Sequence, residues 1–187
     1  LRLMPKDQPV DLNVELRELV FEGRIWDVVR DTFEYSGQTL VRDYIKHPGA
    51  VAVLAVNESD EILMIRQYRH PVKKYLWEIP AGLLDIAGES HLDAAKRELT
   101  EETYHEAENW ELLQVFHASP GGNSEQIDIF LATGVKPVVS DYQREGEEID
   151  MEVRWVPFDE ALAAVQASEI QSPTAVIAIL GYSNRKK

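Results

Sequence analysis

The clearest helix pattern in the chain covers residues 90–103, and strand patterns lie on both sides of it. Apolar residues recur at helical spacing within it, and Ser90-x-x-Asp93 is a variant of the capping box that begins many helices. The whole chain runs from many strands through this helix to more strands and then to helices. It lacks the strand–helix alternation of a doubly wound sheet, so this order predicts an α+β fold or a mixed α/β sandwich.

Strand patterns account for most of the remaining chain. Segments rich in β-branched and aromatic residues are separated by glycine, proline and polar turns, as expected for strands. Two further helices are predicted at residues 158–167 and 174–182. The expected strands cover residues 14–22, 26–35, 38–47, 51–56, 62–68, 77–82, 112–118, 126–132 and 152–156.

Composition limits the class of protein and its partners. The 187 residues include 19 Lys and Arg against 33 Asp and Glu, which gives a formal net charge of −14. This length fits one domain with a small extension, and the hydrophobic fraction of 44% is ordinary for a globular protein. Such a polyanion repels nucleic acid and anionic lipid, so we expect neither as a partner.

Cysteine usage and the N-terminal residues indicate a compartment. The sequence contains no cysteine, which excludes disulfides, thiolate metal sites and cysteine nucleophiles. No apolar run reaches the length of about 18 residues that a membrane helix needs. Residues 1–10 carry charges and two prolines instead of the apolar region of a secretory signal. These features are typical of a cytoplasmic protein.

Three glutamates share one face of the predicted helix. At about 100° per residue, Glu98, Glu101 and Glu102 lie within about 100° of arc. Each like-charged pair at this spacing costs a few tenths of a kcal/mol. A helix tolerates this repulsion when the face is fully solvated, and it can use the same face to hold divalent cations. The charge pattern alone is compatible with both interpretations.

The surrounding residues resemble the signature of the Nudix hydrolases. That signature is Gly, five residues, Glu, seven residues, Arg-Glu, an apolar residue, any residue, Glu-Glu, any residue, Gly and an apolar residue. The positions that fit it are Gly82, Glu89, Arg97, Glu98, Leu99, Glu101 and Glu102.

The chain departs from the signature at two places. Six residues, rather than five, separate Gly82 from Glu89, and Tyr104 and His105 replace the later Gly and apolar residue. The family's Gly ends the helix in a left-handed turn, which Tyr accepts only with strain. We therefore expect a changed helix end and intact metal binding.

The resemblance implies the architecture and assembly of the chain. It implies a Nudix-like α/β/α sandwich over residues 49–187, with an added N-terminal antiparallel β-sheet region at residues 14–48 and a flexible N-terminus at residues 1–13. Members of one branch of this family are commonly homodimers whose N-terminal strands cross to the partner and complete its adenine pocket. We therefore expect residues 14–48 to contribute to dimerisation.

The resemblance also implies a site for Mg²⁺ or Mn²⁺, ions that prefer hard oxygen ligands. By analogy with the family, Glu98 and Glu102 would be catalytic and direct metal ligands, joined by the carbonyl of Ala81. Glu101 would be an outer or shared ligand.

Three other signature residues have an expected structural role. Gly82 forms the bend, and Arg97 would pair with Glu89 and orient the helix against the glycine loop. As an alternative, Arg97 is only a surface charge.

An acidic loop at residues 141–150 provides the remaining catalytic candidate. In the same branch of the family, this loop carries a mobile glutamate that helps a metal and accepts a proton from water. Glu148 is the expected residue, as metal ligand and catalytic group, with Glu147 as the alternate.

Further stretches resemble the ADP-ribose pyrophosphatase branch of the family. They are a Pro-Gly loop at residues 119–125, a Gln-aromatic-Arg strand end at 67–69 and an approach to the glycine bend at 76–83. A Trp-Val-Pro stretch at 155–157, after the acidic loop, is also similar. Trp26 would stack on adenine, or it is a core or dimer-interface residue. Arg42 and Arg69 are the candidate cations for phosphate. The full substrate-binding set comprises Trp26, Arg42, Arg69, Leu83, Gly122 and Ser124.

The leading hypothesis is Mg²⁺-dependent hydrolysis of ADP-ribose to AMP and ribose 5-phosphate by metal-activated water. One alternative is hydrolysis of another nucleoside diphosphate-linked compound, such as a nucleotide sugar or NADH. Another is a sensor that binds ADP-ribose without catalysis, and a third is a plain acidic interaction domain. A small-molecule nucleoside diphosphate compound is expected as the substrate in the first two cases and as the ligand of the sensor.

Overall fold

The computed structural model describes residues 4–144 and 146–186, apart from the side chain of Glu147. The chain forms two compact units. The N-terminal unit contains the residues up to His47 together with Ser119–Ser124. The second unit, here called the sandwich unit, contains Pro48–Ala118 and the residues from Glu125 onward. In the described residues, no helix has the length and apolar character needed to cross a membrane.

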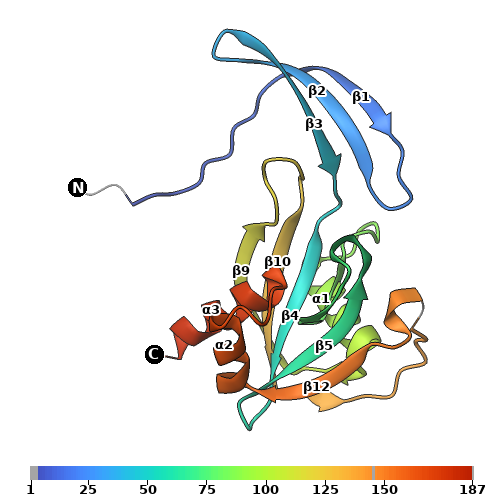
Figure 1. The fold of residues 1–187 in the computed structure, drawn as a ribbon, viewed down its shortest axis with the longest axis vertical. Coiled ribbons are helices and arrows are strands. Elements are labelled where there is room, and N and C mark those ends of the chain that lie inside the picture. Colours follow the sequence, from blue (N-terminus) through green and yellow to red (C-terminus); the bar gives the residue numbers. More distant parts are fainter. Residues whose placement is uncertain (1–3, 145, 187) are drawn as a thin grey trace. The chain divides into compact units, whose positions relative to one another are not determined.

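An antiparallel sheet in the order β1-β2-β3 forms the N-terminal unit (Figure 1). Its strands are β1 (Val14–Phe21), β2 (Asp27–Tyr35) and β3 (Gln38–Lys46). Ser36 and Gly37 join β2 to β3 and have φ values of 51° and 76°. A two-residue turn with positive φ at both positions matches the twist of the strands, which explains the tight hairpin at this Ser-Gly pair.

The segment 119–124 attaches to the end of β3 within the N-terminal unit. The N–H of Ile45 donates to the carbonyl of Gly122 at 3.0 Å, and the N–H of Ser124 donates to the carbonyl of Ile45 at 3.0 Å. The Ser124 hydroxyl accepts a further hydrogen bond from the N–H of His47 at 2.9 Å. Backbone pairing therefore joins this loop to a strand about 75 residues earlier in the chain.

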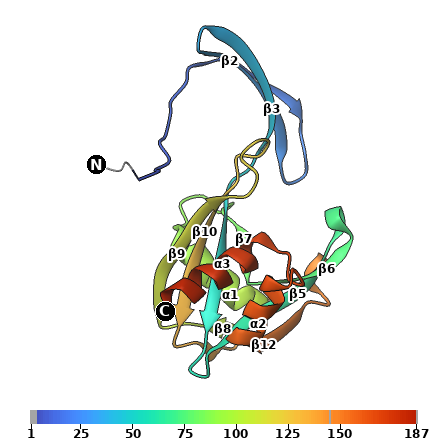
Figure 2. The ribbon, with the colours of Figure 1, turned by 60° about the vertical axis from the view of Figure 1, so that its left-hand side comes forward.

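A mixed sheet of seven strands forms the centre of the sandwich unit (Figure 2). Strands β4 and β10 run parallel, and the other pairs are antiparallel. A short 3₁₀ turn (His70–Val72) joins β5 to β6, and a separate pair is formed by β8 (His105–Glu106) and β11 (Lys136–Pro137). The sheet order is β12 (Glu152–Pro157), β5 (Glu61–Arg69), β4 (Ala50–Val56), β10 (Gln126–Thr133) and β9 (Asn109–His117), with β6 (Lys74–Glu78) on β5 and β7 (Ala81–Leu83) on β4.

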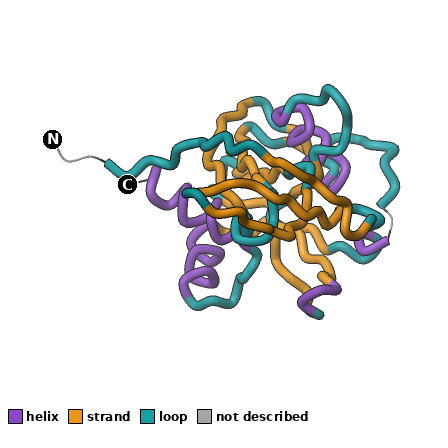
Figure 3. Tube along the Cα trace, turned by 90° about the horizontal axis from the view of Figure 1, so that it is seen from above, coloured by secondary structure: helices purple, strands orange, loops and turns teal. Residues whose placement is uncertain are grey.

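Helices cover both faces of this sheet (Figure 3). On one face, Leu54 and its neighbours pack against α2 (Phe158–Gln166) and α3 (Pro173–Arg185). On the other, Val53 and its neighbours pack against α1 (His91–Thr103). Because alternate residues of β4 enter opposite cores, the whole strand is buried. The predicted α/β/α sandwich with an added N-terminal antiparallel sheet is confirmed.

The expected strand at residues 77–82 is wrong in one respect. It is two strands, β6 and β7, which pair with different neighbours on either side of Pro80. Proline has no N–H to donate, so it interrupts the ladder. Its carbonyl accepts a hydrogen bond from the N–H of Val53 at 2.8 Å, which keeps the break attached to the centre of the sheet.

The expected change at the end of the signature helix is also wrong. Helix α1 begins at the predicted cap, where the Ser90 hydroxyl accepts from the N–H of Asp93 at 3.1 Å. At its other end, Tyr104 adopts the left-handed conformation with φ 57° and ψ 40°, and its N–H donates to the carbonyl of Thr100 at 2.9 Å. Tyrosine therefore takes the backbone geometry that favours glycine, at a strain on the order of 1–3 kcal/mol.

One buried carboxylate holds together the strands of the N-terminal unit. Asp31 on β2 is 6% exposed and accepts two hydrogen bonds from Arg17 on β1, both at 2.6 Å. Tyr44 on β3 donates a third hydrogen bond at 3.0 Å. Hydrogen bonding from Arg17 lowers the pKa of Asp31, although burial opposes this shift.

We predict that Asp31→Asn lowers the free energy of unfolding at pH 7 by on the order of 1 kcal/mol, because Arg17 is half-exposed and solvent weakens the pair. A carboxyl whose pKa is lower in the folded state stabilises that state above its ordinary pKa of 3.8 and loses this contribution as the pH falls through the lower folded value. Urea unfolding of both proteins from pH 7 to pH 3 should therefore show a difference that shrinks at the acidic end. The variant Asp43→Asn, which breaks an exposed pair with Arg30, is the control and should have a smaller effect. A difference independent of pH would contradict the prediction.

Candidate active site

Arg97 connects the glycine loop to the acidic face of α1. Its Nε and Nη2 donate to the two carboxylate oxygens of Glu89, both at 3.0 Å. Its Nη1 donates to Glu98 at 2.5 Å and to Glu101 at 3.0 Å. The loop before Glu89 turns at Gly88, where φ is 82°, and the N–H of Glu89 donates to the carbonyl of Ile86 at 3.2 Å. The expected pairing of Arg97 with Glu89 is present, and the alternative of a mere surface charge does not describe this residue.

The carboxylate of Glu98 lies directly over the backbone of Gly82. A Cβ atom placed at residue 82 would lie 1.9 Å from Cδ of Glu98. Burial raises the pKa of Glu98, and the neighbouring charge of Arg97 opposes this shift. Any side chain at residue 82 would therefore force the Glu98 carboxylate to move from this position.

Glu102 is the most enclosed carboxylate of the site. The residue is 4% exposed, and its Oε2 accepts a hydrogen bond from the N–H of Ala81 at 2.9 Å. Burial raises the pKa of Glu102 well above its ordinary value; the Ala81 hydrogen bond opposes the shift, and the charges of Glu98 and Glu148 add to it. An ionised carboxylate at this position therefore favours a nearby cation.

Glu148 approaches the helix carboxylates from the loop before β12. It ends a 3₁₀ turn (Gly146–Glu148), and its Oε2 accepts a hydrogen bond from the hydroxyl of Tyr142 at 3.2 Å. Burial, followed by the charge of Glu148, raises the pKa of Tyr142 to about 12. The charge of Glu148 also raises the pKa of Glu98 and of Glu102. The side chain of Glu147, the alternate candidate, lies outside the described residues.

Arg69 lies at the end of β5 and is held in place by a buried acid. Its Nε and Nη2 donate to the carboxylate of Glu78 on β6 at 3.0 and 2.7 Å. Glu78 is only 5% exposed, whereas the Arg69 side chain is 39% exposed. Burial raises the pKa of Glu102, and the positive charge of Arg69 opposes this rise. Leu83, another substrate candidate, ends β7 and pairs with Ala50.

The other substrate candidates belong to the N-terminal unit. Trp26 is 44% exposed and stacks on His47, with ring centroids 6.0 Å apart. Arg42 on β3 is exposed, and its Nη1 donates to the carbonyl of Val41 at 2.8 Å. Gly122 and Ser124 lie in the segment that pairs with the end of β3. Trp26 is therefore not a core residue of the chain.

Sequence reasoning missed the roles of Glu78 and Tyr142. Glu78 was recognisable as a lone acid within the apolar stretch around Trp77 and Ile79. No local pattern marks Tyr142, because its contact with Glu148 depends on the path of the loop.

A model of the NUDIX domain matches residues 46–175. The chain belongs to the Nudix family.

Named relatives match most of the chain. The chain is 39% identical over 165 residues to the ADP-ribose pyrophosphatase of Mycobacterium tuberculosis, a match that covers 87% of this chain and 79% of that protein. It is 37% identical to the methanol dehydrogenase activator of Bacillus methanolicus, with 87% of each chain covered. It is 36% identical to the ADP-ribose pyrophosphatase of Bacillus subtilis, with 87% and 88% covered.

A solved structure shares the fold. A crystal structure described as an ADP compounds hydrolase matches with a TM-score of 0.78 and 21% identity, covering 96% of both chains. This likeness supports the Nudix-like architecture of the chain.

We predict that Gly82→Ala lowers kcat/KM of this Nudix hydrolase by about 100-fold or more, because the added methyl displaces the Glu98 carboxylate. The clash is with the end of a flexible side chain, so the melting temperature should stay within about 3 °C of the wild-type value. Steady-state kinetics and thermal unfolding measure the two effects.

Gly181→Ala is the matched control. A Cβ at this position in α3 meets open space, and alanine favours the helix. This variant should keep full activity. A Gly82→Ala enzyme with normal activity would show that the Glu98 position is not required.

Proposed function

We propose that the chain catalyses divalent-metal-dependent hydrolysis of ADP-ribose to AMP and ribose 5-phosphate. The observation that carries this proposal is the acidic group beside Gly82, formed by the buried Glu102 and the half-buried Glu98 and Glu148. The negative charges of these carboxylates repel one another, and their oxygen atoms are suitable ligands for a hard cation. The relatives named ADP-ribose pyrophosphatase support the choice of substrate.

The donor set fits Mg²⁺ or Mn²⁺. In the described residues, no three acidic or histidine side chains converge at coordinating distances, so the fit rests on donor chemistry and charge. Glu98, Glu102 and the carbonyl of Ala81 would hold the ion, with Glu101 and Glu148 as further ligands. When bound, such an ion polarises phosphoryl oxygens and lowers the pKa of its water.

The protein groups have separate roles in this proposal. Glu148 accepts the proton of the attacking water, and the hydroxyl of Tyr142 holds its carboxylate in place. Arg69 binds a phosphate, with its guanidinium oriented by Glu78. Arg97 connects the glycine loop to α1 and so sets the spacing between Gly82 and Glu98. Leu83 offers its backbone to the ligand.

The N-terminal unit completes the proposal with adenine recognition and dimerisation. Trp26 would stack on adenine, and Arg42, Gly122 and Ser124 would contact the ligand. Several apolar side chains of the unit are exposed to solvent in the single chain, which supports a second copy of the chain as the partner. They include Leu16, Leu19, Val20 and Phe21 of β1. We assign residues 14–48 to dimerisation and residues 49–187 to the hydrolase domain; the first three residues of the extension expected at 1–13 lie outside the described residues. We propose a cytoplasmic homodimer.

We expect purified protein with Mg²⁺ and about 1 mM ADP-ribose to release AMP and ribose 5-phosphate in equal amounts. EDTA should stop the reaction. Glu98→Gln and Glu102→Gln should each lose most activity, since a ligand charge disappears while the side-chain shape is kept. Glu106→Gln, an exposed site on β8, is the control and should remain active.

Substrate comparison separates the alternatives. The ratios of kcat/KM for ADP-ribose, ADP-glucose, GDP-mannose and NADH identify the preferred compound. Tight ADP-ribose binding without any AMP release would identify a sensor. Absence of both binding and turnover would contradict the proposal.

We predict that Glu148→Gln lowers kcat by about 100-fold or more and changes KM little, because the carboxylate acts on water in the transition state. Asp150→Asn removes one charge from the same loop, where Asp150 accepts a hydrogen bond from the hydroxyl of Tyr75 at 3.3 Å. This control should retain near-normal kcat. An equal loss in both variants would indicate a general effect of loop charge.

A further inference from the structure

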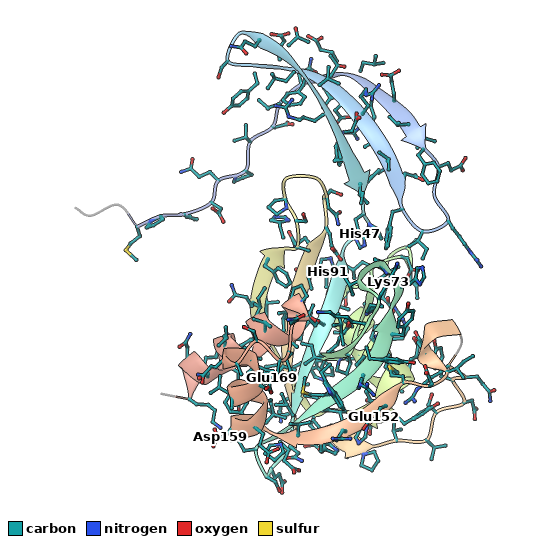
Figure 4. The ribbon with its side chains drawn as sticks, viewed as in Figure 1. His47, Lys73, His91, Glu152, Asp159 and Glu169 are labelled. Carbon is teal, nitrogen blue, oxygen red and sulfur yellow. The ribbon has the colours of Figure 1, made fainter. Side chains whose placement is uncertain are left out.

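Arg144 connects the loop of Glu148 to the helix that carries the other glutamates. Its Nη2 donates to the backbone carbonyl of Glu102 at 2.6 Å, and its Nη1 donates to the carbonyl of Met151 at 3.2 Å. One acceptor, Glu102, belongs to α1. The other, Met151, follows the turn that presents Glu148. Glu152, labelled in Figure 4, then begins β12.

Tyr104 completes this connection from the end of α1. The guanidinium of Arg144 lies over its ring, 5.0 Å from the centroid. The Tyr104 hydroxyl donates to the backbone carbonyl of Tyr142 at 3.2 Å. Tyr142 in turn donates its hydroxyl to Glu148. The loop is therefore held before Glu148 by Tyr104 and after it by Arg144.

The chemistry of a helix end explains these contacts. The last carbonyls of a helix have no N–H partner within the helix, and a positive charge is favourable near that end. Arg144 meets both needs at Glu102 and also contacts an aromatic ring. Tyr104 stands where the signature has glycine, and its left-handed backbone directs a ring and a hydroxyl to the loop.

We propose that Tyr104 and Arg144 form a clasp that positions Glu148 against Glu98 and Glu102. Both are positioning residues, because they act through Glu148 and not on the substrate. The catalytic part of this inference rests on the proposed function. The clasp also explains why a residue with an unfavourable backbone conformation is useful at position 104.

Tyr104→Gly separates positioning from support of the fold. Glycine removes the backbone strain. If the only role of Tyr104 is to end the helix, the variant should therefore be equally or more stable and its kcat should be unchanged. A clasp predicts that the melting temperature is kept while kcat falls about tenfold at nearly constant KM. Arg144→Met should cause the same pattern. Arg154→Met removes an arginine that lies over Trp77 and has no contact with the clasp in the described residues, so it should leave kcat unchanged.

A double-mutant cycle tests whether the clasp acts through Glu148. In the Glu148→Gln background, adding Tyr104→Gly or Arg144→Met should change kcat by less than about twofold. If each substitution costs its full factor in both backgrounds, the clasp does not act through Glu148 and the proposal is overturned.

Hydrogen exchange of the metal-free protein provides a test that is independent of activity. Arg144→Met and Tyr104→Gly should speed amide exchange in peptides covering residues 140–151, and Arg154→Met should not. Unchanged exchange in the first two variants would overturn the clasp. If the wild-type protein hydrolyses no nucleoside diphosphate compound but the loop still loosens in these variants, the proposed function fails and the clasp is retained as a loop-fixing device.

Discussion

The constraint on which the rest of the site depends is the concentration of negative charge in a partly buried region of the sandwich unit. Glu98 and Glu102 project from α1 toward the strand break at Pro80 and Gly82, and Glu148 adds a third charge. Burial and mutual repulsion both disfavour the ionised forms. Arg97 and Arg69 offset only part of this cost. The geometry is therefore suited to binding a hard cation together with an anionic ligand.

The scaffold keeps this arrangement rigid because the strand next to it is buried on both faces. Strand β4 pairs with β7 at Ala52 and Ala81, one residue before Gly82. Residues of β4 also enter the core beneath α1, together with Ala95 and Leu99. The position of Glu98 over Gly82 is thus determined by strand pairing and by helix packing, which share the same central strand. Precise placement of this kind is what a metal-dependent site requires.

Local signals predicted the parts of the site that are close in sequence. The cap at Ser90 and the shared helical face of Glu98 and Glu102 follow from spacing within one helix, whereas the pairing of Arg97 with Glu89 was expected from the resemblance to the family signature. The strand break at Pro80 and the pairing of residues 119–124 with β3 were not predicted, because each depends on which distant strand supplies a hydrogen-bond partner. The contact between Arg144 and Glu102 spans 42 residues and has no local pattern.

Tyr104 shows why a departure from a signature does not have to weaken a site. The signature glycine favours the left-handed turn through backbone freedom alone, whereas Tyr104 adopts the same turn and adds contacts to Arg144 and Tyr142. The backbone strain is therefore offset by interactions that glycine cannot make, and these contacts fall on the loop that carries Glu148. A local conflict between residue and conformation, supported by contacts from elsewhere in the fold, is the pattern expected at a functional position.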